Sequence, residues 1–317
     1  MSVHHRDWIR GRSFDWREFS RADLARRRAT ISVCVPTLDE ALSIERTLAP
    51  LLDLLDAGLV DQVAVVDSGS TDGTQSIVEE FRTELHDARE LVPGSGQLLG
   101  KGDALWRSLA VLHGEIICFV DADSEDFGEH FVTGLVGPLL AMPAVQFAKA
   151  CYRRPFKVGG VQLDSGGGRV TELTARPLLN AFYPDLAVFG QPLAGEIAAR
   201  RSLLLQLPFD TRYAVETGML IDVWSRVGLE GMAQVDLGTR QNRHRPLAEL
   251  TPMAAAVLQA VATRLRQEGR LMGTTSGRLL SSPGGDSDGI DVRVAQRPPF
   301  DSLMTGSREP WASAGAD

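Results

Sequence analysis

Apolar residues change their spacing along the chain in a repeating way from Thr30 onward. Continuous apolar runs predict strands within 30–40, 60–74 and 115–123. Between them, apolar residues recur every three or four positions and predict helices within 41–55, 74–85 and 102–114. Strands without polar alternation are buried on both faces, so this order predicts a Rossmann-like α/β fold with a mainly parallel sheet flanked by helices.

The rest of the chain is less regular and sets the expected domain limits. Residues 1–29 are polar and arginine-rich with scattered Trp and Phe, which indicates an arm with one helix, docked by its aromatics. The regular pattern fills a first half, 30–150, and a second half, 151–269, is expected to cap it. Residues 270–317 are rich in Gly, Ser, Asp and Pro and predict a flexible tail.

Composition narrows the class of protein. Of 317 residues, 44% are hydrophobic and 23% charged, as in a soluble globular protein. The formal charge of −8 argues against a nucleic-acid binder, so an anionic ligand would need a local basic cluster. Cys34, Cys118 and Cys151 have no CxxC spacing and are expected to be reduced thiols. We find no secretory signal at the N-terminus and no apolar stretch of membrane length, and expect a cytoplasmic protein without a membrane partner.

Polar segments follow three of the predicted strands, at 36–40, 67–72 and 121–123. In a parallel sheet the carboxyl ends of the strands form one edge, and ligands bind beyond that edge. We therefore expect these three segments to meet at a ligand site.

The sequence "VDADSEDF" places Asp121, Ala122 and Asp123 at the end of a buried strand. A calcium EF-hand would require glycine at the sixth position and Glu at the twelfth, where this chain has Asp126 and Val132. At the sheet edge, one carboxylate of an Asp-x-Asp can face a ribose and the other a divalent cation that bridges two phosphates. Mg²⁺ or Mn²⁺ suits such oxygen ligands.

Lys101 lies between two glycines just before a predicted helix, in "LLGKGDALW". This is not a Walker A motif, because Ser95 replaces its first glycine and Gly102 follows the lysine. A helix N-terminus attracts anions, so Lys101 is a candidate for a pyrophosphate contact, although an exposed turn lysine fits the segment equally well. The chain also lacks a G-x-G-x-x-G after its first strand, which disfavours a nicotinamide site.

Further candidates each have a plain structural alternative. Asp67 could contact a nucleoside or only organise a turn. Arg169 and Thr171, after three glycines, could cradle an anion or follow a simple turn. Glu216 opens an apolar helix, where it could favour the helix N-terminus, bind a sugar hydroxyl or assist proton transfer. The basic cluster 240–245 is either a solvated face or the site of an anionic substrate.

Taken together, these segments resemble a known family. The motifs "VPTLDEALSIE", "VDSGSTDGT", "GKGDALWRSLA", "YRRPF", "GGGRVTELTARPLL" and "QPLAGEIAARRSLL" are similar to those of the glucosyl-3-phosphoglycerate synthases of glycosyltransferase family 81. The similarity runs from about Thr30 to Leu250. It implies an A-type glycosyltransferase fold, a nucleotide-sugar-binding first half and an acceptor-binding second half. It also implies a metal-dependent retaining transfer of glucose from UDP-glucose to the 2-hydroxyl of D-3-phosphoglycerate, in a homodimer.

Residue reasoning and resemblance together define the expected sites. The expected donor site consists of Pro36, Leu38, Glu40, Asp67, Ser68, Lys101, Asp121 and Ala122. The expected acceptor site consists of Gly168, Arg169, Thr171, Arg240 and His244. Catalytic roles fall to Lys101 and Glu216, and Asp123 is the expected acidic metal ligand.

One motif departs from the family. Its pattern Arg-Ala-His-Arg-Asn-Arg-Pro has the His as a metal ligand and the Asn at the acceptor, whereas here Asn242 and His244 exchange places. We expect Asn242 at the metal, where a neutral oxygen suits Mg²⁺, and His244 at the acceptor, with His244 as the alternative ligand. GDP-mannose as donor, or a nucleotide-sugar-binding protein that has lost turnover, are the alternatives for function.

Overall fold

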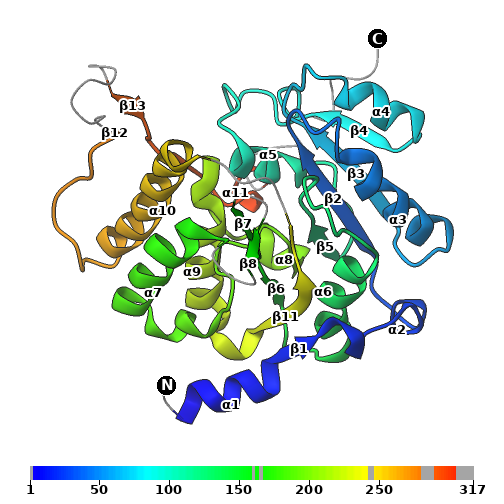
Figure 1. The fold of residues 1–317 in the computed structure, drawn as a ribbon, viewed down its shortest axis with the longest axis horizontal. Helices are drawn as coiled ribbons and strands as arrows, with labels where there is room; N and C mark the ends of the chain where they lie inside the picture. Colours follow the sequence, from blue (N-terminus) through cyan, green and yellow to red (C-terminus); the bar gives the residue numbers. More distant parts are fainter. Residues whose placement is uncertain (1–2, 159–160, 164–166, 242–245, 280–288, 305–317) are drawn as a thin grey trace.

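A computed structural model describes residues 3–158, 161–163, 167–241, 246–279 and 289–304. Its centre is an eight-stranded mixed sheet in which most neighbours are parallel (Figure 1). β9 alone in this sheet runs antiparallel to both of its neighbours, β5 and β6. In spatial order the strands are β1 (Ser13–Asp15), β11 (Met232–Thr239), β6 (Phe147–Arg153), β9 (Ile197–Arg200), β5 (Ile116–Phe119), β2 (Ile31–Thr37), β3 (Gln62–Asp67) and β4 (Glu84–Asp87).

Helices cover both faces of the sheet because its central strands are apolar on both. In β2, Cys34 packs into one hydrophobic cluster, while its neighbours Val33 and Val35 pack into the other. The Val33 face is covered by α3 (Ile44–Asp56), α4 (Thr74–Glu80) and α6 (His130–Ala141). The Cys34 face is covered by α5 (Lys101–Ser108), α7 (Arg176–Phe182), α8 (Arg201–Leu204), α9 (Val215–Val227) and α10 (Leu247–Gln267) (Figure 1). The predicted layered architecture is confirmed.

Two sequence expectations about elements and limits need correction. The helix expected over 74–85 ends at Glu80, and β4 begins at Glu84 after Arg82 turns the chain with φ 53°. The expected boundary at residue 150 falls inside β6, and β11 from the second half pairs with β6 along its length. Both halves therefore share one sheet.

The N-terminal arm adds an edge strand to that sheet and contains two helices where one was expected, α1 (Val3–Arg12) and α2 (Arg21–Ala25). Aromatic docking is as predicted. Trp8 is buried, its ring centroid lies 5.1 Å from that of Phe189, and its Nε1 donates to the Leu229 carbonyl at 2.7 Å.

The C-terminal region differs from the expected flexible tail over residues 289–304. β14 (Gln296–Arg297) pairs with β10 (Phe209–Asp210), and Phe300, just before α11 (Asp301–Met304), is buried. The remaining strands form two small hairpins, β7 (Phe156–Val158) with β8 (Val161–Leu163) and β12 (Arg278–Leu279) with β13 (Ile290–Asp291). The three cysteines are free thiols. Within the described ranges we find no helix with both the length and the apolarity that a membrane span requires.

Candidate active site

Two loops at the carboxyl ends of β2 and β3 are tied together by their own side chains. The buried carboxylate of Asp67 accepts hydrogen bonds from the backbone of Gly69 and Ser70 and from the side chains of Thr37, Ser70 and Gln75. Burial raises the pKa of Asp67, but these hydrogen bonds outweigh it and lower the pKa below its ordinary value. Asp67 therefore organises the loop, and its predicted donor contact stays a prediction.

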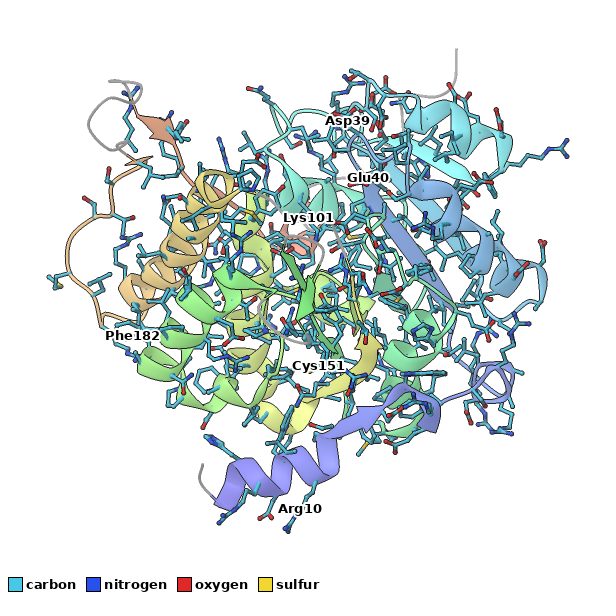
Figure 2. The ribbon with its side chains drawn as sticks, in the orientation of Figure 1. Arg10, Asp39, Glu40, Lys101, Cys151 and Phe182 are labelled. Carbon is cyan, nitrogen blue, oxygen red and sulfur yellow. The ribbon has the colours of Figure 1, made fainter. Side chains whose placement is uncertain are left out.

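The first of these loops presents two residues of the expected donor site. Asp39 adopts a left-handed φ of 56°, and its side chain accepts a hydrogen bond from the backbone N–H of Thr71 at 2.8 Å. The neighbouring Leu38, which is 55% exposed, and Glu40 line a cleft. Figure 2 labels Asp39 and Glu40 on this loop. Pinning the loop to the next strand end fixes the direction of both side chains before any ligand binds.

Lys101 lies between two carboxylates that come from different elements. It begins α5, and its Nζ lies 2.6 Å from Oδ1 of Asp121, just past β5, and 2.9 Å from Oε1 of Glu216, in the first turn of α9. Burial lowers the pKa of Lys101, but the two carboxylates outweigh it and hold the pKa well above its ordinary value. Lys101 therefore stays an ammonium ion, and the structure brings both predicted catalytic residues together.

Arg240 joins this trio to the predicted metal ligand. Its Nη2 lies 3.2 Å from Oδ2 of Asp121 and 2.6 Å from Oδ1 of Asp123, while its Nη1 lies 3.0 Å from Oε1 of Glu196 and 2.9 Å from the Tyr152 hydroxyl. Burial would raise the pKa of Asp121, but Lys101 and Arg240 outweigh it and hold that pKa well below its usual range. A chain of alternating charges thus runs from Glu216 to Asp123.

Gly195 allows this close packing of charges. A Cβ at this position would lie 2.5 Å from both Lys101 Nζ and Asp121 Oδ2. The adjacent Glu196 directly precedes β9, which runs antiparallel to its neighbours. The amino end of β9 therefore reaches the same sheet edge as the carboxyl ends of the parallel strands.

Lys149, in β6, lies close to this chain of alternating charges. It is 1% exposed, and its Nζ donates to the Ala194 carbonyl at 2.7 Å. Burial lowers the pKa of Lys149 to about 8, and the charges of Glu216 and Glu196 only partly oppose that shift.

A cleft of about 940 Å³ adjoins Asp123 and brings the expected donor and acceptor segments together. Leu38 and Glu40 line one part, and Gly168, Arg169 and Thr171 line another. Two other residues of the expected donor site make hydrogen bonds within the fold. Ser68 donates its N–H to the Thr37 carbonyl, and the carbonyl of the buried Ala122 accepts from Thr47 Oγ1. Pro36, in β2, is half-buried.

Of the expected metal ligands, Asp123 is the one that lies in the described part of the chain. Its side chain is 41% exposed and lines the cleft, whereas that of Asp121 is 18% exposed and paired with two cations. Over the described ranges, no three His, Cys, Asp or Glu side chains converge on a possible metal position. Mg²⁺ commonly binds through one or two carboxylates plus substrate phosphates, which this donor set fits. Asn242 and His244 lie outside the described residues.

Sequence reasoning did not single out Tyr152, Glu196 or Lys149. Tyr152 and Glu196 lie in the motifs "YRRPF" and "QPLAGEIAARRSLL", which carried the resemblance but received no role. The sequence signal that could have found them is a charged or phenolic residue at one end of an apolar strand. For Glu196 this signal was not recognised, because β9 runs antiparallel to its neighbours and the residue therefore precedes its strand.

Comparison with known proteins identifies the family of the chain. Residues 32–180 match the family described as Glycosyl transferase family 2. The glucosyl-3-phosphoglycerate synthase of Mycolicibacterium smegmatis is 42% identical over 93% of this chain and 98% of its own length.

Two solved structures are also similar. The mannosyl-3-phosphoglycerate synthase of Rubrobacter xylanophilus has a TM-score of 0.85 and 43% identity, covering 94% of this chain and 98% of that one. The glucosyl-3-phosphoglycerate synthase of Mycobacterium tuberculosis, crystallised with Mn²⁺, UDP-glucose and phosphoglyceric acid, has a TM-score of 0.78 and 42% identity, covering 89% and 93%. With this fold, this charge network and relatives matched over nearly their whole length, the chain belongs to the glucosyl-3-phosphoglycerate synthase family of glycosyltransferases.

Proposed function

We propose that this protein transfers glucose from UDP-glucose to the 2-hydroxyl of D-3-phosphoglycerate with retention of anomeric configuration. The observation that carries the proposal is the continuity between the Lys101–Asp121–Arg240–Asp123 chain and the cleft lined by Glu40 and Arg169. Donor-type and acceptor-type segments therefore open onto one space. The ligands crystallised with the Mycobacterium tuberculosis relative support these two substrates.

In the proposed reaction, the acceptor hydroxyl approaches the anomeric carbon from the side of the leaving group. A bond forms from that hydroxyl to the anomeric carbon, the bond to the diphosphate oxygen breaks, and the hydroxyl proton passes to a diphosphate oxygen. Lys101, fixed as an ammonium ion by Asp121 and Glu216, stabilises the departing diphosphate. Glu216 orients Lys101 and borders the transferred sugar, and Arg169 binds the acceptor's phosphate or carboxylate.

Asp123, with Asn242 or His244, would hold the divalent cation, Mg²⁺ or Mn²⁺. When bound, the cation supplies charge stabilisation of the two phosphates. Arg240 holds Asp123 at the cleft through its 2.6 Å contact, so the carboxylate is placed by the protein itself. Chelation with EDTA should abolish transfer, and added Mg²⁺ or Mn²⁺ should restore it. Full turnover in EDTA would contradict the metal assignment.

A second donor has a specific observation in its favour. The Rubrobacter xylanophilus relative is a mannosyl-3-phosphoglycerate synthase that matches the fold at a TM-score of 0.85. The two donors differ in base and sugar, so the contacts of Leu38 and Glu40 would have to accommodate a guanine instead of a uracil.

The test compares UDP-glucose and GDP-mannose with 3-phosphoglycerate and Mg²⁺ or Mn²⁺, and measures nucleotide release and the mass of the product. Product from UDP-glucose supports the proposal. Product from GDP-mannose alone would show that GDP-mannose, and not UDP-glucose, is the donor. UDP binding without product from either donor would support the non-catalytic alternative. NMR of the anomeric proton checks retention. A cytoplasmic homodimer is a further proposal, which light scattering of the purified protein and fractionation of cells would test.

A further inference from the structure

The segment that leads to Lys101 is irregular, yet two arginine side chains, one buried and one 16% exposed, hold its backbone. Between β4 and α5, residues 88–100 form turns without helix or strand. The buried Arg107 of α5 reaches back over this segment and donates to the carbonyls of Leu91, at 3.1 Å, and Gly96, at 2.6 Å. These hydrogen bonds satisfy two backbone carbonyls of a segment that has no helix or strand of its own.

The second arginine comes from the C-terminal strand β14. Arg297 donates to the carbonyls of Ser95, at 2.6 Å, and Gln97, at 3.2 Å. Its guanidinium also makes a two-pronged pair with Asp103, Nε to Oδ1 at 2.8 Å and Nη2 to Oδ2 at 2.6 Å. Such fork-to-carboxylate pairs fix orientation as well as distance. Arg297 is separated from Asp103 by 194 residues in sequence, so only the fold brings them together.

Asp103 passes this constraint to the start of α5. It is fully buried in the first turn of the helix, two residues after Lys101. Besides Arg297 it binds Arg107 Nε at 3.2 Å and accepts the backbone N–H of Leu99 at 2.8 Å. One carboxylate therefore connects the C-terminal strand, the preceding turn and the helix that begins with Lys101.

The remaining contacts around α5 come from the same C-terminal segment and from the strand with which it pairs. A Cβ on Gly102 would overlap the Asp210 carbonyl of β10, the strand with which β14 pairs. Trp106, one helical turn further on, donates from Nε1 to the Pro298 carbonyl at 2.8 Å and packs against Phe300, with ring centroids 5.4 Å apart. The C-terminal segment thus contacts α5 at two successive turns.

We propose that Arg297 is a positioning residue that sets the place of the Lys101 ammonium through Asp103. Without its guanidinium, Asp103 keeps one arginine partner instead of two, and the turn at Ser95–Leu99 loses two carbonyl contacts and part of its anchor. The start of α5 can then shift relative to Asp121 and Glu216, which are fixed from other elements. This inference rests on the proposed role of Lys101 at the donor diphosphate.

The test compares Arg297→Ala and Arg297→Lys with Arg293→Ala in the full-length protein. Arg293 is a matched control in the same segment, because its side chain is 77% exposed and pairs with Asp291. A misplacement of about 1 Å can cost on the order of 100-fold in rate, so we expect kcat of Arg297→Ala to fall by about 10- to 100-fold. KM for UDP-glucose should rise, and KM for 3-phosphoglycerate should stay unchanged.

Two further readouts separate positioning from loss of structure. Methylguanidinium should restore part of the turnover of Arg297→Ala, because it can refill the fork site beside Asp103. Arg297→Lys should fold but stay slow, because an ammonium cannot make the two-pronged contact. Wild-type kcat in Arg297→Ala, or a loss that follows thermal unfolding and does not respond to methylguanidinium, would overturn the proposal.

UDP binding, measured by calorimetry with Mg²⁺ present, keeps this test separate from that of the proposed function. Should the wild-type protein bind UDP but transfer neither sugar, the proposed function fails. The positioning role is then judged by UDP affinity alone, which Arg297→Ala should weaken and Arg293→Ala should leave unchanged. Equal affinity in wild type and Arg297→Ala would refute it.

Discussion

Lys149 offers a quantitative test of the charge network, because it is a buried cation among charges of both signs. Its ammonium has one hydrogen bond, to the Ala194 carbonyl, and faces the carboxylates of Glu196 and Glu216 together with the competing charge of Lys101. Replacement by Met keeps much of the side-chain volume and removes the titrating group. The chain has only three lysines, so few other amines titrate over the same range of pH.

The sign and size of the effect follow from the pKa shift. Burial lowers the pKa of Lys149 from 10.5 to about 8 in the folded protein. Below pH 8 the amine is charged in both states; between the two values it is neutral when folded and charged when unfolded. The free energy of unfolding therefore rises with pH across this window; it is lost as pH falls from 10.5 to about 8 and is flat below that. The shift corresponds to about 3 kcal/mol in the free energy of unfolding.

The assay is urea unfolding, followed by tryptophan fluorescence, of wild type and Lys149→Met from pH 6.5 to 10.5. The difference in unfolding free energy, wild type minus variant, should be flat below about pH 7.5 and increase by about 3 kcal/mol by pH 10.5. Lys149→Arg is the control: its guanidinium does not titrate, so the difference from wild type should show the same increase. A difference that stays flat over the whole range would refute the pKa reasoning.

Two further substitutions test the packing of the site. Gly195→Ala would place its Cβ 2.5 Å from both Lys101 Nζ and Asp121 Oδ2. We expect a loss of about 1–3 kcal/mol in stability and on the order of 100-fold in kcat, whereas Gly11→Ala, whose Cβ meets nothing within 4 Å, should leave kcat unchanged. Wild-type turnover of Gly195→Ala would contradict the tight ion pair. Asp67→Asn replaces a carboxylate that only accepts hydrogen bonds, and should lower the free energy of unfolding measured in urea by about 2–3 kcal/mol. An unchanged free energy of unfolding would show that the loop does not depend on the Asp67 carboxylate.

Sequence reasoning was most successful where neighbouring residues decide the outcome. The apolar runs that became β2, β3 and β5 predicted a parallel sheet, and the edge of that sheet located Asp121 and Asp123. Lys101 was ambiguous between a phosphate contact and a turn residue. Its Asp121 and Glu216 partners come from positions 20 and 115 residues further along the chain, and no local pattern reports such pairings.

The parts that sequence did not predict depend on strand order and direction. Glu196 reaches Arg240 because β9 is inserted in reverse between β5 and β6, which a one-dimensional pattern does not specify. The sequence around Arg297 resembles a polar tail, because a strand of only two residues and a single Phe give a weak hydrophobic pattern. Its docking is encoded instead by the complementarity of one guanidinium with Asp103 and the turn before α5.

The formal charge of the network explains why an acidic protein would need a cation to bind a diphosphate. Three cationic side chains meet four carboxylates here: Lys101, Lys149 and Arg240 against Asp121, Asp123, Glu196 and Glu216. The formal sum is −1, so the side chains fix one another but leave no surplus positive charge for two phosphates. Arg240 also neutralises part of Asp123, the carboxylate nearest the cleft. A divalent ion at Asp123 would reverse that sign, because it brings two positive charges to the one carboxylate that is substantially exposed.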